Sequence, residues 1–497
     1  MNRRVFLQSS AAATVTAATQ KRDELAQLDA TAQADLVRKK QVSALELVEA
    51  AIARIEKLNP QLNAVVWRRF EQARDEAKSK SLPRGPFTGV PFLAKDLGCA
   101  IAGEPESQGS RFLKSNGYRT ALTSELALRI KRAGFINVGR TNTPEFGSVA
   151  TTEPLAWGPT RNPWDLTRTT SGSSGGSCAA VAALMVPVAH GTDGGGSART
   201  PAAACGIVGL KPSRGRISTY PGTEWVAPVS VQGFVTRSIR DLATCLDFAS
   251  GSLPGETAAP PAPTRPYGQE VAASPGKLRI GLMTRFASTV KGELDPECRK
   301  GVEQAGKLLE SLGHYVEIAH PPVLDQPKTG TIFLRIWPVR LLAALQGFEK
   351  AIGKTAGSDD LDPDTQFFLD LGRKTQAADY VTALGDMQAF TFAMADWWTS
   401  GFDLLVTPTT GMVTPKLGSL SLAGGKVDDI VRWTPFTSYF NLTGQPAITL
   451  PLHWSAEDLP VGVQFAAAYG REDLLIRVAA QLEKASPWAG RIPAVHG

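Results

Sequence analysis

The sequence predicts an α/β fold built as a single large domain. Short apolar stretches suited to buried strands alternate with helix patterns, as where residues 123–133 favour a helix and 135–139 a strand. The chain has 497 residues, which exceeds the usual one-domain range but remains compatible with one large α/β domain. Its composition, 43% hydrophobic and 20% charged, is ordinary for a globular protein with a sizeable core.

The first residues are typical of a targeting signal rather than of a folded domain. Arg3 and Arg4 precede Val-Phe-Leu and an alanine-rich stretch that ends at Ala18. Paired arginines before a weak apolar region indicate a twin-arginine export signal over residues 1–18, and hence a periplasmic or secreted protein. A disordered tail on a cytoplasmic protein is the alternative. No other stretch reaches about 18 consecutive apolar residues, so no membrane anchor is expected after signal removal.

Residues 24–490 are predicted to form the domain, and their first part, residues 24–80, to be peripheral helices. Ser43 and Glu46 have the spacing of a capping box, which begins a helix. Asn59-Pro60 is expected to end that helix, and residues 70–80 to form the next one. These helices carry no candidate catalytic group.

Residues 85–250 contain the candidate chemistry, beginning with a lysine. The apolar stretch 87–93 predicts a strand that brings Lys95 to its end, and the apolar residues before Lys95 indicate at least partial burial. Further on, Glu145 and Glu153 could be taken for a catalytic carboxylate pair. Nothing in the sequence fixes them together, so structural roles are expected for both.

Two glycine–serine loops, Ser171 to Ser177 and Gly191 to Ser197, flank the apolar run 179–189, which is predicted to form one buried segment. Glycines allow tight bends and let backbone N–H groups converge, whereas serine supplies a nucleophile or a proton relay. Flexible linkers are the alternative. Linkers seldom bracket so apolar a run, which favours a functional site.

Three kinds of site fit glycine-rich loops. Neither phosphate-binding pattern, G-x-x-x-x-G-K-[ST] or G-x-G-x-x-G, is present in this stretch. Residues 172–176 match the nucleophile elbow G-x-S-x-G with Ser174 as nucleophile, but the polar residues before them are a poor buried strand, so the match is interpreted as chance. The third possibility makes Ser197 the nucleophile and uses the N–H groups of three glycines to bind the oxyanion. These are Gly194, Gly195 and Gly196.

With the segment 89–96, both loops resemble the amidase signature family of serine hydrolases. The resemblance runs from about residue 30 to about residue 485 and implies a mixed, many-stranded sheet covered by helices. It also implies a Ser–Ser–Lys triad of Ser197, Ser173 and Lys95, with Ser173 following a cis peptide bond. The two serines are 197 − 173 = 24 residues apart, as in the family. Ser171 stands where the family usually has glycine.

Within that family, residues 151–164 and 188–191 resemble the 6-aminohexanoate cyclic dimer hydrolases. The stretch 330–340 matches this subgroup less well. It lies in the predicted helical region 323–400, which in the family shapes the substrate pocket. Trp337, in this region, is expected to be a core residue.

The rest of the chain, residues 276–490, is predicted to be a second α/β part of the same domain. A Pro- and Ala-rich stretch, 254–275, leads into it as a linker or exposed loop. Within residues 276–490, strands are expected at 278–283, 402–408, 447–452 and 461–465, and helices at 298–312 and 472–484. A further strand is expected earlier in the chain, at 207–211.

The remaining ionisable residues exclude several other kinds of site. Five cysteines without a C-x-x-C pair give no metal or disulfide pattern, and Cys178 and Cys205 are interpreted as small buried hydrophobes. His190 precedes Ser197 by seven residues but ends an apolar run, so a structural role is preferred to a Ser–His–Asp triad. The charge of +6 shows no run of five Lys or Arg, which argues against a nucleic-acid partner.

The sequence therefore predicts an amidase that hydrolyses a linear or cyclic carboxylic amide through an acyl-enzyme on Ser197. Asp193 and Arg199 are expected to pair and hold the nucleophile loop, with Ser174 in a supporting place. No cofactor or metal is expected; the partner is a small amide, and a homodimer is left open. The alternatives are the glutamine-hydrolysing subunit of a tRNA amidotransferase and a non-catalytic binding protein on the same scaffold.

Overall fold

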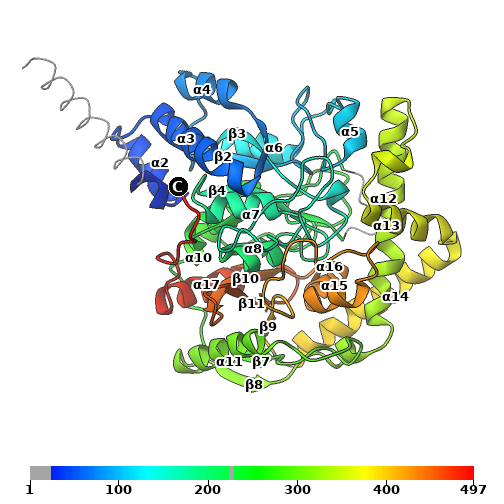
Figure 1. Cartoon of the computed structure of the whole chain (residues 1–497). Helices are drawn as coiled ribbons and strands as arrows, with labels where there is room; N and C mark the ends of the chain where they lie inside the picture. The colour runs from blue at the N-terminus through cyan, green and yellow to red at the C-terminus, as the bar shows by residue number, and fades with distance from the viewer. Residues whose placement is uncertain (1–23, 223–228) are drawn as a thin grey trace, which may run out of the picture.

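The computed structural model describes residues 24–222 and 229–497. The predicted twin-arginine segment, residues 1–18, lies outside them, so export stays a prediction. The described residues form one mixed sheet of 11 strands in the order β1-β3-β2-β4-β6-β5-β10-β11-β9-β7-β8 (Figure 1). The strand bounds are β1 Val65–Arg68, β2 Pro91–Lys95, β3 Ile136–Thr141, β4 Val188–Asp193, β5 Val208–Lys211, β6 Val231–Thr236, β7 Arg279–Leu282, β8 Tyr315–Ile318, β9 Leu404–Pro408, β10 Ala447–Trp454 and β11 Pro460–Ala466. The predicted α/β class and single large domain are confirmed.

Helices cover both faces of this sheet, and a group of longer helices stands at one side of it (Figure 1). The side group is α12 Thr329–Ile352, α13 Pro363–Lys374 and α14 Ala377–Thr399. The other helices are α2 Ala30–Arg38, α3 Ala44–Leu62, α4 Phe70–Lys78, α5 Arg111–Ser115, α6 Glu125–Arg132, α7 Gly175–Ala182, α8 Arg199–Cys205, α9 Ile239–Ala249, α10 Tyr267–Glu270, α11 Pro296–Ser311, α15 Val427–Trp433, α16 Ser438–Thr443 and α17 Glu472–Ala485. In the described ranges, no helix has the length and apolar character needed to cross a bilayer.

The period of two along β2 assigns its side chains to the two faces of the sheet. Phe92 and Ala94 join the core that also contains residues of α9, α11 and α17. Leu93 joins the opposite core, which contains residues of α3, α7 and α8. Lys95 shares the parity of Leu93, so it faces α7. This alternation is what brings a lysine side chain to the start of that helix.

Several predicted elements are confirmed with small shifts in their bounds. The capping box of Ser43 and Glu46 is present at the start of α3. The predicted 87–93 strand is β2, which begins four residues later and contains Lys95 as its last residue. The helical region 323–400 is confirmed as α12, α13 and α14, and the strands predicted at 402–408, 447–452 and 461–465 are β9, β10 and β11.

Two predictions for residues 24–80 are wrong. The helix that Ser43 begins does not stop at Pro60 but runs to Leu62, where Asn63 ends it in a left-handed conformation. Proline removes one backbone hydrogen bond near the end of the helix, which the last turn tolerates. The stretch 24–80 also contains a strand, β1, which pairs antiparallel with β3.

The apolar run 179–189 is not one segment. Its first part completes α7, and its last residues begin β4. Between them Leu184 adopts φ +63°, a left-handed conformation that reverses the chain. Each glycine–serine loop therefore adjoins an element, the first at the start of α7 and the second between β4 and α8.

Candidate active site

Lys95 lies at the end of β2 with its side chain fully buried. Its Nζ is 2.7 Å from the Ser173 hydroxyl, 2.8 Å from that of Thr192 and 3.1 Å from that of Ser174. Burial lowers the pKa of Lys95 from 10.5 to about 7, because the charged ammonium loses its hydration. Near neutral pH this amine therefore exists partly in the uncharged form, which can accept a proton.

Ser173 and Ser174 adjoin at the beginning of α7, but their hydroxyl groups have different surroundings. The Gly172–Ser173 peptide bond is cis, as the family resemblance implies. The Ser173 side chain lines a cavity, whereas Ser174 is fully buried. The Ser174 hydroxyl donates to the Thr192 carbonyl over 3.1 Å and accepts the Thr192 N–H over 3.2 Å. No strand precedes Ser174 between β3 and α7, so the interpretation of the G-x-S-x-G match as chance agrees with the structure.

Ser197 lies in the turn between β4 and α8 and is partly exposed to the same cavity as Ser173. Two hydrogen bonds join the first loop to the second loop and to the start of α8, which follows it. The Ser174 N–H donates to the Ser197 carbonyl over 3.0 Å, and the Thr200 hydroxyl donates to the Gly172 carbonyl over 3.1 Å. The structure thus brings Lys95, Ser173 and Ser197 into one place, although the two serines come from separate loops.

The glycines before Ser197 differ in how closely they are packed. A Cβ on Gly194 would lie 3.0 Å from the Ser230 hydroxyl and 3.1 Å from the Trp337 ring, and one on Gly195 would lie 3.1 Å from the Phe333 ring, so those side chains would have to shift slightly. Gly196 has φ +132°, and a Cβ there would be 2.4 Å from the Thr437 hydroxyl. Gly196 is therefore restricted to glycine both by close packing and by its backbone conformation.

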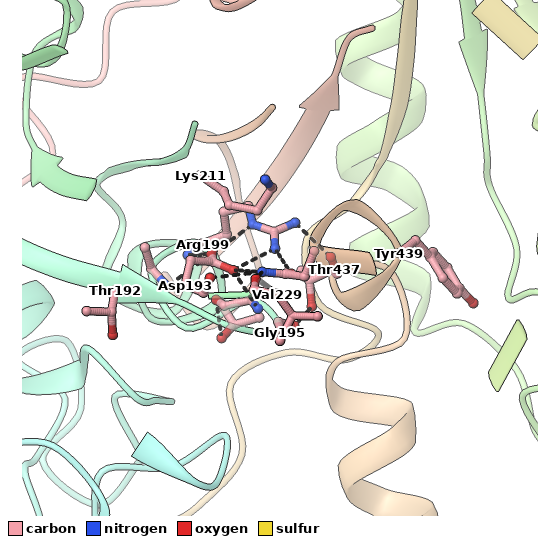
Figure 2. Close-up of polar contacts among 12 residues, drawn as sticks. Thr192, Asp193, Gly195, Arg199, Lys211, Val229, Thr437 and Tyr439 are labelled. Carbon is pink, nitrogen blue, oxygen red and sulfur yellow. Dashed lines mark hydrogen bonds and ion pairs between the residues drawn. The ribbon is translucent and has the colours of Figure 1, made fainter. Parts of the chain in front are cut away.

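The predicted pair of Asp193 and Arg199 is present and forms the centre of a buried network (Figure 2). Two guanidinium nitrogens of Arg199 donate to the two carboxylate oxygens, over 2.8 and 2.9 Å. This pairing lowers the pKa of Asp193 to about 2 in spite of its burial. The same guanidinium donates to partners that come from the C-terminal part of the chain. They are the Thr437 carbonyl, the Gln464 amide oxygen and the Asn441 amide oxygen.

One sequence assignment in this loop is wrong. The N–H of Gly196, expected to bind an oxyanion, donates to Asp193 Oδ1 over 2.9 Å. Within the described residues, the N–H groups of Gly194 and Gly195 have no such acceptor. A hydrogen bond of 2.6 Å from the Thr437 hydroxyl to the Gly195 carbonyl fixes the peptide that follows. Of the three glycine N–H groups expected to bind an oxyanion, those of Gly194 and Gly195 are therefore the two without an acceptor among the described residues.

Ser197 opens onto two cavities. The first, of about 380 Å³, is lined mainly by apolar side chains, among them Phe333 and Leu422. The second, of about 520 Å³, is more polar and is lined by Ser173, Thr192 and Gln232 as well as Ser197. Trp337, expected to be a core residue, is partly buried against two hydrophobic clusters and also lines both cavities.

The structure accounts for the serine at position 171, where the family usually has glycine. It has φ +62°, the left-handed conformation that glycine adopts without steric cost. Its hydroxyl accepts from Trp433 Nε1 over 3.1 Å and donates to the Ala150 carbonyl over 3.1 Å. These hydrogen bonds hold a serine in a position that would otherwise favour glycine.

The other candidate groups take structural roles, as predicted. Glu145 accepts the Asp362 N–H over 2.7 Å, and Glu153 accepts the Gly418 N–H over 2.8 Å. His190 Nε2 bonds Gln232 over 2.8 Å, and burial lowers its pKa to about 3. Cys178 and Cys205 are buried in the core around α7 and α8. Among the described residues, no three His, Cys, Asp or Glu side chains are grouped so as to hold a metal.

The sequence missed the groups that lie far from the loops along the chain. Thr192 was not singled out, although it adjoins the predicted Asp193 and bonds Lys95. Thr437, Asn441 and Gln464 follow Arg199 by 238, 242 and 265 residues, so no local pattern could place them.

Known proteins and solved structures are similar to this chain over almost its whole length. The family model described as Amidase matches residues 46–476. The 6-aminohexanoate-cyclic-dimer hydrolase of Paenarthrobacter ureafaciens is 42% identical over 482 residues, which cover 94% of this chain and 96% of that protein. A solved 6-aminohexanoate cyclic dimer hydrolase complexed with substrate is 40% identical and superimposes with a TM-score of 0.91, covering 95% of this chain and 100% of that one. A bacterial aryl acylamidase of the amidase signature family is 28% identical with a TM-score of 0.84, over 93% and 99% of the two chains.

Proposed function

The chain belongs to the amidase signature family, whose members hydrolyse amide C–N bonds, and on this basis we propose that it cleaves its amide through an acyl-enzyme formed on Ser197. One observation carries the proposal. A fully buried lysine with a pKa near neutrality lies 2.7 Å from the Ser173 hydroxyl, on the wall of the cavity that also contains Ser197. Such a lysine can serve as the base that a serine nucleophile requires.

The reaction has two stages. Neutral Lys95 accepts the proton of Ser173, Ser173 accepts that of Ser197, and Ser197 Oγ attacks the amide carbon. The N–H groups of Gly194 and Gly195 stabilise the negative charge that develops on the carbonyl oxygen. Protons return through Ser173 to the leaving nitrogen as the C–N bond breaks, and water then hydrolyses the ester on Ser197.

We further propose a small amide, linear or cyclic, as the substrate. The cyclic dimer named for the similar hydrolases is the first compound to test, together with linear alkyl and aryl amides. A tRNA amidotransferase subunit is the related alternative, and it predicts glutamine hydrolysis with co-purifying partner subunits. A binding protein without catalysis is the other, and it predicts no covalent labelling.

Fluorophosphonate labelling tests the assignment of the nucleophile. Wild type is expected to be labelled at Ser197, and Ser197→Ala to lose both labelling and hydrolysis while keeping its unfolding midpoint. Ser174→Ala is the matched control, because it removes a hydroxyl that is 3.1 Å from Lys95 but buried away from the cavity. It should still be labelled at Ser197. Labelling that maps to Ser174 would show that the assignment is wrong.

A further inference from the structure

We propose that Glu106 binds an ammonium group on the leaving-amine part of the substrate, so that the enzyme favours amides whose amine part carries a positive charge. This inference rests on the proposed function, because it assumes that Ser197 is acylated and that Ser173 returns the proton. Glu106 belongs to the loop that follows β2 and was not singled out in the sequence.

The first step is to decide which cavity receives the leaving amine. Ser197 lines both cavities, so the bond to be broken lies where they meet. Ser173 lines only the second cavity, whereas the first is bordered by the neighbouring Gly172. A group that gives a proton to the leaving nitrogen must lie within hydrogen-bond reach of it. The amine part therefore occupies the second cavity, and the acyl part occupies the first, more apolar one.

The second step concerns the charges of the amine-side cavity. Among the described residues that line it, Glu106 carries the only carboxylate and Arg340 the only permanent cation. Arg340 belongs to α12, and its guanidinium carbon lies 5.8 Å from the centre of the Trp337 ring. Glu106 belongs to the loop that follows β2, so the two charges come from segments far apart in the sequence.

The third step is that the Glu106 carboxylate is only partly satisfied by the protein. Its Oε1 accepts from the Gln108 amide over 3.1 Å and from the Gly98 N–H over 3.4 Å. In the described part of the chain, Oε2 has no donor and no Lys or Arg forms an ion pair with Glu106. By contrast, Glu104 nearby pairs with Arg69 over 2.7 Å, and Asp96 accepts from Ser107.

These observations identify the ligand chemistry. A carboxylate that is only 4% exposed is costly to bury without a cation, and an ammonium group entering the cavity would supply the missing partner. The interaction would be stronger than one at the surface, because the Glu106 side chain is largely buried and charges there are less screened. An amine product, which is protonated on release, would find the same partner.

Three hexanamides that share one acyl group test this inference. Their leaving amines are 1,5-diaminopentane, with a terminal ammonium, hexylamine, its neutral isostere, and 6-aminohexanoate, with a terminal carboxylate. The rate of release of hexanoate, the acid product common to all three amides, gives kcat/KM for each of them. Shorter diamines vary the distance between the cleaved bond and the ammonium group.

Wild type is expected to prefer the ammonium-bearing amide to the neutral one by about tenfold, the size of one charge-assisted hydrogen bond. Glu106→Gln, which keeps the acceptor for Gln108, should bring this ratio close to one. Asp428→Asn is the matched control, since it removes the same charge from the wall of the first cavity and should keep the ratio. Glu106→Asp, which keeps the charge, should retain part of the preference.

Inhibition gives a readout that does not depend on turnover. Free pentylamine, which is an ammonium ion at neutral pH, should slow fluorophosphonate labelling of wild type more than the uncharged pentan-1-ol does, and should lose this advantage with Glu106→Gln. A wild-type ratio near one, a ratio unchanged in Glu106→Gln, or a preference for the carboxylate-bearing amide would overturn the inference. Cleavage of the neutral amide without any preference refutes this inference alone, whereas failure to cleave any amide refutes the proposed function as well.

Discussion

The lowered pKa of Lys95 makes a quantitative prediction about the pH dependence of catalysis. A lysine with a pKa of about 7 is about half neutral at pH 7, whereas an ordinary lysine, at about 10.4, would be neutral in only about one molecule in 2,500. Burial thus raises the active fraction of the base by roughly a thousandfold at neutral pH. Because the neutral form is the active one, kcat/KM should rise with pH through about 7 and level off roughly one pH unit above it.

The assay is kcat/KM for a neutral linear amide between about pH 5 and pH 9, with kcat/KM falling about tenfold per pH unit on the acid side. Enzyme held at each pH and assayed again near pH 8 separates this titration from unfolding. Lys95→Arg should be as inactive as Lys95→Ala at every pH, since a guanidinium does not lose its proton in proteins. An activity that begins to rise only near pH 10, or near-normal turnover by Lys95→Arg, would refute the assignment of Lys95 as the base.

Substitutions at two positions in the loops complete the predictions. Gly196→Ala forces a side chain into φ +132° and to within 2.4 Å of the Thr437 hydroxyl, so we expect kcat/KM to fall at least 100-fold and stability by about 1–3 kcal/mol; wild-type kinetics for this variant would contradict the packing argument. Ser171→Ala leaves the buried Trp433 Nε1 without its acceptor and should lower the urea unfolding free energy by about 1–3 kcal/mol. Ser171→Gly should lose less than Ser171→Ala, because it also relieves the left-handed backbone, and the reverse order would count against this account.

The sequence could point to the candidate catalytic groups because their signals are local. A lysine after an apolar strand and two glycine–serine loops are visible within short windows, and the structure brings Lys95 to Ser173 over 2.7 Å. The fold class followed in the same way, from alternating helix and strand patterns. The four-residue strands β1 and β8 were missed and the equally short β5 and β7 were predicted, because β5 and β7 are mostly buried, whereas most residues of β1 and β8 are at least partly exposed.

The features that the sequence did not predict depend on contacts between residues that are far apart in the chain. Trp337 occupies a helical pattern that fits a core position, and only the placement of α12 beside the nucleophile loop turns its ring toward the cavities. The hydrogen bond from the Gly196 N–H to Asp193 depends on the conformation of the turn, and a run of glycines does not determine that conformation. The acceptors of Arg199 lie beyond residue 430 and could not be inferred from the loop itself.

The network around Arg199 has a consequence for the order in which this protein can mature during synthesis. The residues of the nucleophile loop and of α8 have all been synthesised once residue 205 is added. The Arg199 guanidinium, however, donates hydrogen bonds to acceptors at positions 437, 441 and 464. While the chain emerges from the ribosome, Arg199 and Asp193 lack these partners, and the carbonyl of Gly195 lacks the Thr437 hydroxyl. A nascent or prematurely terminated chain therefore carries Lys95, Ser173 and Ser197 without the contacts that hold the loop, so we expect the loop to reach its final shape only after β11, the last strand in the sequence, has joined the sheet.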